Sequence, residues 1–283
     1  MTTTENKQAA VINANILLHT KAADDYKDEP HYRPENVQKV ESKLVEIFRD
    51  TNAKRLLDLG CGMGFIIDIA KNHIKEIVGV DATQAMLDRV DRSGPANITL
   101  LNGDTGAVTL EPASFDVATA YAVLHHLYDI EPTFKTAYKA LKPGGKFYVD
   151  LEPNYYCWEA VDALKRDGEY DPIVKREIEM ITYIDEVVLE RWGIDKDVVD
   201  LAEFGKTGGG FKGDQLQETL TRIGFSKVEI TYHWYIGQRS LINDERFSKE
   251  ERFRYVGVVN ELLLKQMPLS RHLFKYIGFV ATK

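Results

Sequence analysis

The chain has little cysteine and no long uncharged apolar run. Its 283 residues include only two cysteines, Cys61 and Cys157, and Cys61 lies in a glycine-rich stretch where a structural disulfide is not expected. A transmembrane helix needs about 20 consecutive apolar residues, and no such run occurs. The apolar residues at 11–18 are interrupted by Asn13 and Asn15 and make a poor signal-peptide core. We therefore expect a cytoplasmic protein without a membrane span.

Basic residues are outnumbered by acidic ones. Lysine and arginine total 36 against 44 aspartates and glutamates, a formal net charge of −8. Such a chain lacks the basic surface of a nucleic-acid-binding protein, so no nucleic-acid partner is expected. Cysteine and histidine show no metal-ligand spacing, so no metal site is predicted. The composition is typical of a globular protein, with 44% hydrophobic and 28% charged residues.

Residues 56–65 read LLDLGCGMGF, an apolar strand that runs into a glycine-rich turn and then a helix. The glycines are Gly60, Gly62 and Gly64. Glycine adopts positive φ and lets a ligand approach the main chain, and the start of the helix presents free N–H groups. A dinucleotide fingerprint would place its third glycine at position 65, which is Phe65. The spacing therefore indicates a nucleotide-type cofactor loop of another kind, G-x-G-x-G, preceded by Asp58.

Acidic residues follow the next two predicted strands. Residues 76–81 form an apolar strand that ends in Asp81, 21 positions after Gly60. A carboxylate at the end of a second strand can accept hydrogen bonds from both hydroxyls of a ribose. A short strand at 98–101 is followed by Asp104 and Thr105. Each acid could also be an ordinary strand-end or turn residue.

These motifs, with a strand at 115–121 and a Pro-Gly-Gly turn at 143–145, resemble class I S-adenosylmethionine (SAM)-dependent methyltransferases of the small-molecule type. The resemblance covers roughly residues 50–152. It implies SAM as cofactor and S-adenosylhomocysteine as product. The cofactor-binding residues that it implies are Tyr26, Asp58, Gly60, Cys61, Gly62, Gly64, Asp81, Ala82, Met86, Asp104, Thr105, Ala120 and Tyr121.

Candidate catalytic residues lie after the fourth and fifth strands. His125 and His126 follow the strand at 115–121, and histidine titrates near neutral pH, as a general base requires. Similar methyltransferases often carry a His-His pair here. Adjacent helical side chains point about 100° apart, so at most one is expected to face the site. Glu152 is expected to orient a base or hold a substrate. Structural roles for all three remain open.

The alternation of helix and strand over residues 36–151 predicts an α/β fold. We expect a doubly wound, mostly parallel seven-stranded sheet with helices on both faces, an antiparallel last strand and a helical cap. Four segments are predicted. They are an irregular N-terminal arm at 1–35, a SAM-binding core at 36–152, a helical cap at 153–210, and the remainder of the core at 211–283 with a helical insertion before the last strand.

The cap and the arm are expected to cover the carboxyl ends of the strands, where ligands bind in such sheets. Apolar residues recur at helical spacing at Ile173, Ile178, Ile181, Ile184 and Val188. The three glycines at 208–210 suggest a hinge, and Gly205-Lys206-Thr207 lacks the earlier glycine of a phosphate loop. The aromatic residues at 155, 156 and 158 either line a substrate wall or form the core of the cap.

The expected function is in-line transfer of a methyl group from SAM to an oxygen, nitrogen or carbon nucleophile of a small molecule. Three alternatives stay open: a non-catalytic SAM-binding module, an NAD-dependent oxidoreductase, and a methyltransferase acting on a macromolecule. The sequence indicates neither the acceptor nor an oligomeric state.

Overall fold

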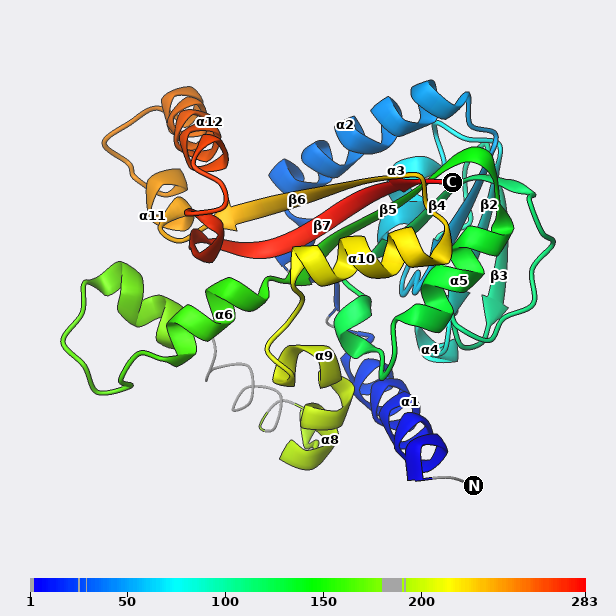
Figure 1. Ribbon diagram of the computed structural model, residues 1–283, viewed down its shortest axis with the longest axis horizontal. Coiled ribbons are helices and arrows are strands. Elements are labelled where there is room, and N and C mark those ends of the chain that lie inside the picture. Colours follow the sequence, from blue (N-terminus) through cyan, green and yellow to red (C-terminus); the bar gives the residue numbers. More distant parts are fainter. Residues whose placement is uncertain (1–2, 25, 29, 180–189, 191) are drawn as a thin grey trace.

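The computed structural model describes residues 3–24, 26–28, 30–179, 190 and 192–283. Its centre is one seven-stranded sheet in the order β3-β2-β1-β4-β5-β7-β6 (Figure 1). The first five strands are parallel, and β7 runs antiparallel to both of its neighbours. The strands are β1 Arg55–Leu59, β2 Glu76–Asp81, β3 Asn97–Asn102, β4 Phe115–Tyr121, β5 Leu141–Pro153, β6 Lys227–Tyr235 and β7 Phe274–Thr282. This confirms the predicted fold class.

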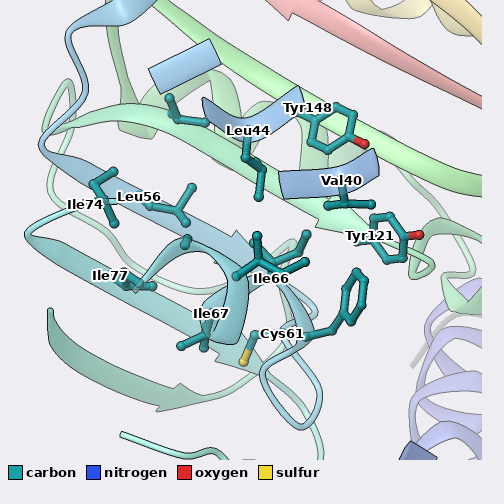
Figure 2. Packing of buried hydrophobic residues seen from close by; sticks show 14 of the residues in the cluster. Val40, Leu44, Leu56, Cys61, Ile66, Ile67, Ile74, Ile77, Tyr121 and Tyr148 are labelled. Carbon is teal, nitrogen blue, oxygen red and sulfur yellow. The ribbon is translucent and has the colours of Figure 1, made fainter. Parts of the chain in front are cut away.

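Helices cover both faces of the sheet. On one face α2 (Pro34–Thr51) and α3 (Phe65–Ala70) bury residues such as Leu44 and Ile66 (Figure 2). On the other face α5 (Glu131–Ala140) and α10 (Gly213–Ile223) bury residues such as Phe134 and Leu220. Every residue of β4 is buried, as expected for a central strand covered on both sides. The short helix α4 (Gln84–Leu87) follows β2.

The N-terminal arm is a helix, so the prediction of an irregular segment was wrong. Helix α1 spans Thr3–Ala22, 20 residues. Val11, Ala14 and Leu18 are buried on one side of it, at the three- and four-residue spacing of a helix. Asn15, which interrupts the apolar run in the sequence, donates hydrogen bonds to the carbonyls of Val11 and His126, both under 3 Å. The short 3-10 turns η1 (Tyr26–Asp28) and η2 (Pro30–Tyr32) lead to α2.

The segment after β5 contains several helices separated by turns. It contains α6 (Tyr155–Asp162), a helical stretch at 172–179, α8 (Lys196–Ala202) and α9 (Phe204–Thr207). Helix α1 lies beside α8 (Figure 1). Ile178 is buried against Cys157 and Val161, whereas Ile173 is exposed. The predicted stripe positions Ile181, Ile184 and Val188 lie outside the described residues.

Two boundaries differ from the prediction. Strand β5 begins at Leu141 and contains the Pro-Gly-Gly turn, with a register shift opposite β4 between Phe115 and Val117. Because β5 extends to Pro153, Glu152 lies inside the strand rather than after it. The predicted helical insertion before the last strand consists of α11 (Gln238–Ile242) and α12 (Lys249–Lys265), followed by the 3-10 turn η4 (Arg271–Leu273).

No described helix is long and apolar enough to cross a bilayer.

Candidate functional site

The glycine loop follows β1 and requires glycine for two separate reasons. Gly60, Gly62 and Gly64 all have positive φ, at 74°, 50° and 90°. At Gly60 an added Cβ would lie 2.2 Å from a side-chain methyl carbon of Val123. Gly64 occupies the left-handed position directly before α3. The alternating glycines therefore serve both the backbone conformation and the close packing under the loop.

Asp81 joins the end of β2 to this loop. Its Oδ2 accepts a hydrogen bond from the N–H of Gly62 and its Oδ1 accepts one from the N–H of Thr83, both at 2.8 Å. Burial raises the pKa of Asp81, although these backbone hydrogen bonds act in the opposite direction. An ionised carboxylate accepts about four hydrogen bonds, so each oxygen keeps acceptor capacity for a ligand.

A cavity of about 110 Å³ lies against the loop, and we call it the glycine-loop cavity. It is lined by most of the predicted cofactor residues: Tyr26, Gly60, Cys61, Gly62, Asp81, Ala82, Met86, Asp104, Thr105 and Tyr121. Asp58, Gly64 and Ala120, also predicted, are not part of its lining. Asp58 lies buried in β1, where its Oδ1 accepts a hydrogen bond from Thr119, and burial raises its pKa to about 7.

Helix α1 and the turn η2 contribute lining residues that the sequence analysis missed. Gln8, Val11, Ile12, Asn15, His19, His31 and Tyr32 all border the glycine-loop cavity. Of the residues at 1–35, only Tyr26 was predicted to bind the cofactor. Burial lowers the pKa of His31 to about 4, so this imidazole is neutral at physiological pH. An amphipathic spacing from Val11 to Ala22 was the signal that could have revealed the helix.

A second cavity, of about 290 Å³, lies under the helices that follow β5, and we call it the cap cavity. Tyr26, Trp158, Trp192 and Tyr276 line it with aromatic rings. Two of the three aromatic residues predicted for a substrate wall do not line it. The Tyr155 ring lies 4.0 Å from the Lys212 ammonium, and the Tyr156 ring 3.5 Å from the Arg271 guanidinium.

The two cavities share part of their walls. His19, Tyr26, His31, Ala122 and His126 border both of them. Ala122 adopts a left-handed backbone with φ of 54°, which is strained for any residue with a Cβ. Such strain is concentrated at functional sites, where the surrounding structure holds it in place.

His125 and His126 lie on the 3-10 turn η3 (Leu124–His126), which directly follows β4. Their ring centroids are 4.1 Å apart, and both side chains border the cap cavity. The expectation that at most one would face the site was therefore wrong. It assumed an α-helix, whereas a single tight turn at the cavity wall exposes both rings to the same space.

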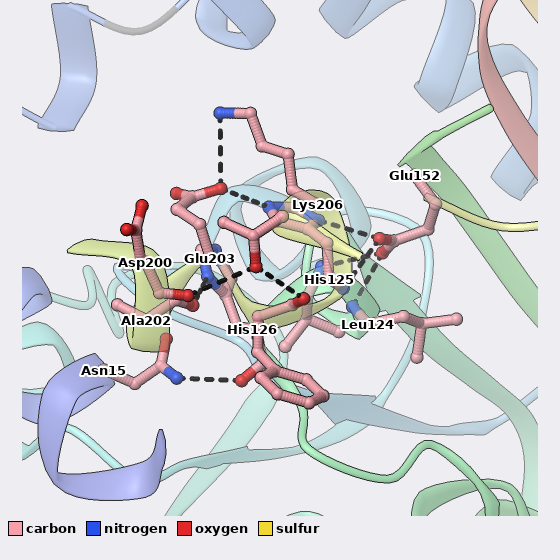
Figure 3. Close-up of polar contacts among 12 residues, drawn as sticks. Asn15, Leu124, His125, His126, Glu152, Asp200, Ala202, Glu203 and Lys206 are labelled. Atoms are coloured by element: carbon pink, nitrogen blue, oxygen red, sulfur yellow. Dashed lines mark hydrogen bonds and ion pairs between the residues drawn. The ribbon is translucent and has the colours of Figure 1, made fainter. Parts of the chain in front are cut away.

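Glu152 holds this turn in place (Figure 3). Its buried carboxylate accepts backbone N–H bonds from Val123, Leu124 and His125 at 2.8 to 3.0 Å. Its Oε2 also lies 2.8 Å from Nδ1 of His125. A carboxylate only accepts, so Nδ1 of His125 carries the proton and Nε2 keeps its lone pair when the ring is neutral. Burial alone would lower the pKa of His125, but the charge and hydrogen bond of Glu152, together with the charge of Glu203, outweigh burial and raise that pKa.

His126 is held in the same tautomer by a different partner. Its Nδ1 lies 2.8 Å from the carbonyl oxygen of Ala202, which can only accept, so Nε2 again carries the lone pair. Burial, followed by repulsion from His125, lowers the pKa of His126 well below its usual value. The side chain of Asn15 donates to the carbonyl of His126 at 2.8 Å, which ties α1 to the turn.

Glu203, between α8 and α9, and Lys206, within α9, complete the polar wall of the cap cavity (Figure 3). Oε2 of Glu203 lies 3.9 Å from Nε2 of His125 and 3.4 Å from Nζ of Lys206. Burial opposes ionisation of Glu203, but Lys206 and the neighbouring histidines hold its pKa well below the usual range. The sequence analysis missed Glu203, because nothing local marks a residue that packing alone brings to the histidines.

Part of the chain is similar to known methyltransferases. Residues 57–149 match the family model described as "Methyltransferase domain". The chain is 27% identical over 174 residues to a probable S-adenosylmethionine-dependent methyltransferase of Mycolicibacterium smegmatis, covering 62% of each chain. It is 33% identical over 111 residues to a ubiquinone biosynthesis O-methyltransferase of Idiomarina loihiensis, covering 37% of this chain and 45% of that one. The chain thus spans less than two thirds of these relatives.

Solved structures support the fold. A SAM-dependent methyltransferase from Archaeoglobus fulgidus superposes with a TM-score of 0.53 at 18% identity, covering 87% of this chain and 94% of that one. One from Mesorhizobium loti gives a TM-score of 0.51 at 20% identity, covering 86% and 96%. The sheet and the glycine loop define a Rossmann-like methyltransferase domain. Residues 57–149 carry a methyltransferase domain, and the chain is similar to class I SAM-dependent methyltransferases.

Proposed function

We propose that the chain transfers a methyl group from SAM in the glycine-loop cavity to an oxygen, nitrogen or carbon nucleophile of a small molecule in the cap cavity. One observation carries this proposal: the two cavities share a wall that includes His126 and Ala122. A cavity of about 290 Å³ suits a small molecule rather than a polymer segment. The O-methyltransferase name of one relative favours oxygen as the first acceptor to test.

The residues of the glycine-loop cavity fit SAM. The free acceptor capacity on both oxygens of Asp81 suits the two ribose hydroxyls. The positive-φ glycines leave the main chain open beside the cavity. Asp104, on the same wall, is the residue proposed for the adenine amino group. When bound, SAM supplies an electrophilic methyl group attached to a sulfonium.

The chain's own contribution is to position the acceptor and to exclude water. Helices α1 and α8 enclose the cap cavity with apolar side chains such as Leu18 and Val199. The bonds from Asn15 to His126 and from His126 to Ala202 join both helices to the histidine turn. Fixing the acceptor near the shared wall supplies the alignment that an in-line displacement needs.

We assign proton removal from the acceptor to the histidine pair. Glu152 orients His125 and makes it the more basic imidazole. His126 borders both cavities and is therefore nearer to the point of transfer. Either Nε2 presents the lone pair that a general base requires.

The test is an assay of S-adenosylhomocysteine release with the full chain across a library of small molecules that carry hydroxyl, amine or activated carbon acceptors. Release that depends on one class of acceptor supports the proposal. SAM binding without release for any compound would favour the non-catalytic alternative. Release only with a protein or nucleic acid would favour the macromolecular one.

We also propose that the protein is cytoplasmic and does not bind nucleic acid. The net charge of −8 supports the absence of a nucleic-acid partner. The two cysteines, Cys61 and Cys157, are both buried and unpaired, which supports a reducing, cytoplasmic location.

A further inference from the structure

We propose that His125, His126 and Glu203 bind one divalent transition-metal cation of the zinc type in the cap cavity. One ligand atom from each of the three side chains lies within 4.8 Å of the other two. Within the described part of the chain, this is the one group of three such side chains that could hold a metal ion. The residues come from two elements 77 positions apart, which is why ligand spacing in the sequence did not predict the site.

The partners of the two imidazoles are those typical of metal-bound histidines. His125 donates its Nδ1 proton to the carboxylate of Glu152, and His126 donates its Nδ1 proton to the carbonyl of Ala202. Metal-ligating histidines almost always donate their other ring N–H to a carboxylate or a backbone carbonyl, which fixes the tautomer. Both rings are therefore held with Nε2 as the electron-pair donor.

Glu203 supplies an oxygen that lacks a hydrogen-bond partner. Its Oε2 is buried, and its neighbours at 3.4 Å on Lys206 and 3.9 Å on His125 are ion-pair contacts rather than hydrogen bonds. The Lys206 ammonium balances the charge of this carboxylate but leaves Oε2 without a hydrogen bond, and an unsatisfied buried oxygen is costly. A metal ion at this position would satisfy that oxygen directly.

Ligand type selects the class of metal. Two imidazole nitrogens and one carboxylate oxygen suit zinc and neighbouring first-row ions, whereas magnesium prefers oxygen ligands throughout. Ligands at about 2.0–2.2 Å from a tetrahedral ion stand about 3.4 Å apart. The three ligand atoms lie within 4.8 Å of one another, so they must approach by up to about 1.4 Å. Lys206 competes for Glu203 and must move away for this to happen.

A metal ion here would also select the acceptor atom of the substrate, an inference that rests on the proposed function. Three protein ligands leave at least one coordination position open. An oxygen or nitrogen of the substrate in that position would be held beside His126, at the wall shared with the glycine-loop cavity. A lone pair that binds a metal cannot accept a proton. His125 and His126 are therefore ligands in the metal-bound chain, and the proton removal proposed above applies to the metal-free chain.

The experiment is calorimetric titration of the chelator-treated full chain with ZnCl₂, and separately with MgCl₂. We expect one zinc ion per chain and no comparable magnesium binding. Glu203→Gln and His126→Ala should each weaken zinc binding by about 10-fold or more. Lys206→Gln should leave it unchanged or tighten it, because a competing cation is removed. Glu177→Gln is the matched control, since this acid also lines the cap cavity but outside the cluster, paired with Lys275.

Absence of stoichiometric zinc binding, or equal binding by the parent and a folded Glu203→Gln, would overturn the proposal. Circular dichroism checks that each variant is folded. If the variants do not fold, the visible absorption spectrum of the parent loaded with Co²⁺ tests the proposed site. Intense visible absorption indicates a four- or five-coordinate site, and the weak spectrum of six-coordinate aqueous cobalt contradicts one. SAM titration of the same metal-free sample tests the proposed function separately, so either proposal can fail alone.

Discussion

Oε2 of Glu152 lies 2.8 Å from Nδ1 of His125 and 3.0 Å from the backbone nitrogen of the same residue. One carboxylate therefore fixes both the main chain and the ring of His125. Since Oε1 also accepts from Val123 and Leu124, Glu152 positions the whole histidine turn from inside β5. Its role is to orient other groups, because the carboxylate itself is buried and does not line the cap cavity.

Glu152→Gln should lower the pKa of His125, because the amide removes the charge that raises it. In the parent, the raised folded-state pKa contributes stability that is fully present below the unfolded pKa of about 6.5. That contribution is lost as the pH rises through the folded pKa. Urea unfolding of both proteins from pH 6 to pH 9 measures the effect. The variant should lose less stability over this range than the parent, and parallel profiles would refute the coupling.

His125→Ala should lower kcat by about 10²–10⁴-fold if the histidine pair removes a proton or holds the acceptor. The affinity for SAM should change little, because His125 borders the cap cavity and not the glycine-loop cavity. Steady-state turnover combined with SAM titration separates the two effects. His73→Ala, at an exposed ion pair with Glu41, is a histidine control outside both cavities and should retain activity. Full turnover in both His125→Ala and His126→Ala would remove the pair from the mechanism.

Gly60→Ala should destabilise the fold. The added Cβ would overlap the Val123 side chain at 2.2 Å and would sit on a residue with φ of 74°. Overpacking costs about 1–3 kcal/mol and the left-handed backbone about 1–2 kcal/mol. Gly103→Ala is the matched control, because an added Cβ there meets nothing within 4 Å. Urea denaturation should show a clear loss for the first variant and almost none for the second, and similar values would contradict the packing argument.

Residues 1–35 and 155–205 should exchange backbone hydrogens more slowly once S-adenosylhomocysteine and an acceptor are bound. Both segments line the cavities, and lids are drawn from the less stable parts of a structure. The strands at 55–59 and 115–120, which are central in the sheet, should exchange slowly throughout. Hydrogen exchange followed by mass spectrometry measures this. Equal protection of 155–205 with and without ligands would make that segment a static wall.

The sheet and the glycine loop could be predicted because their signals are local. Apolar runs of strand length alternate with helices, and Gly60 and Asp81 lie at fixed positions relative to them. Helix α1 was missed because Asn13 and Asn15 obscure its apolar stripe. Asn15 is tolerated there because it bonds both to its own helix and to His126.

The polar wall of the cap cavity could not be predicted in the same way. Glu203 meets His125 only because α8 and α9 fold back onto the histidine turn, a contact that tertiary packing determines. His19 and His31 reach the shared wall for a similar reason, through α1 and η2. Local periodicity carries no information about such long-range contacts.

Titration of the parent and of Asp81→Ala with SAM and with NADH is the most direct test of the cofactor site on which the proposed function depends. The parent should bind SAM and not NADH. The variant should lose two hydrogen bonds to a charged acceptor, each worth roughly 1.5–3 kcal/mol, and bind SAM at least about a hundredfold more weakly. Binding of NADH in preference to SAM, or equal SAM affinity in a folded Asp81→Ala, would contradict the assignment of the glycine-loop cavity to SAM.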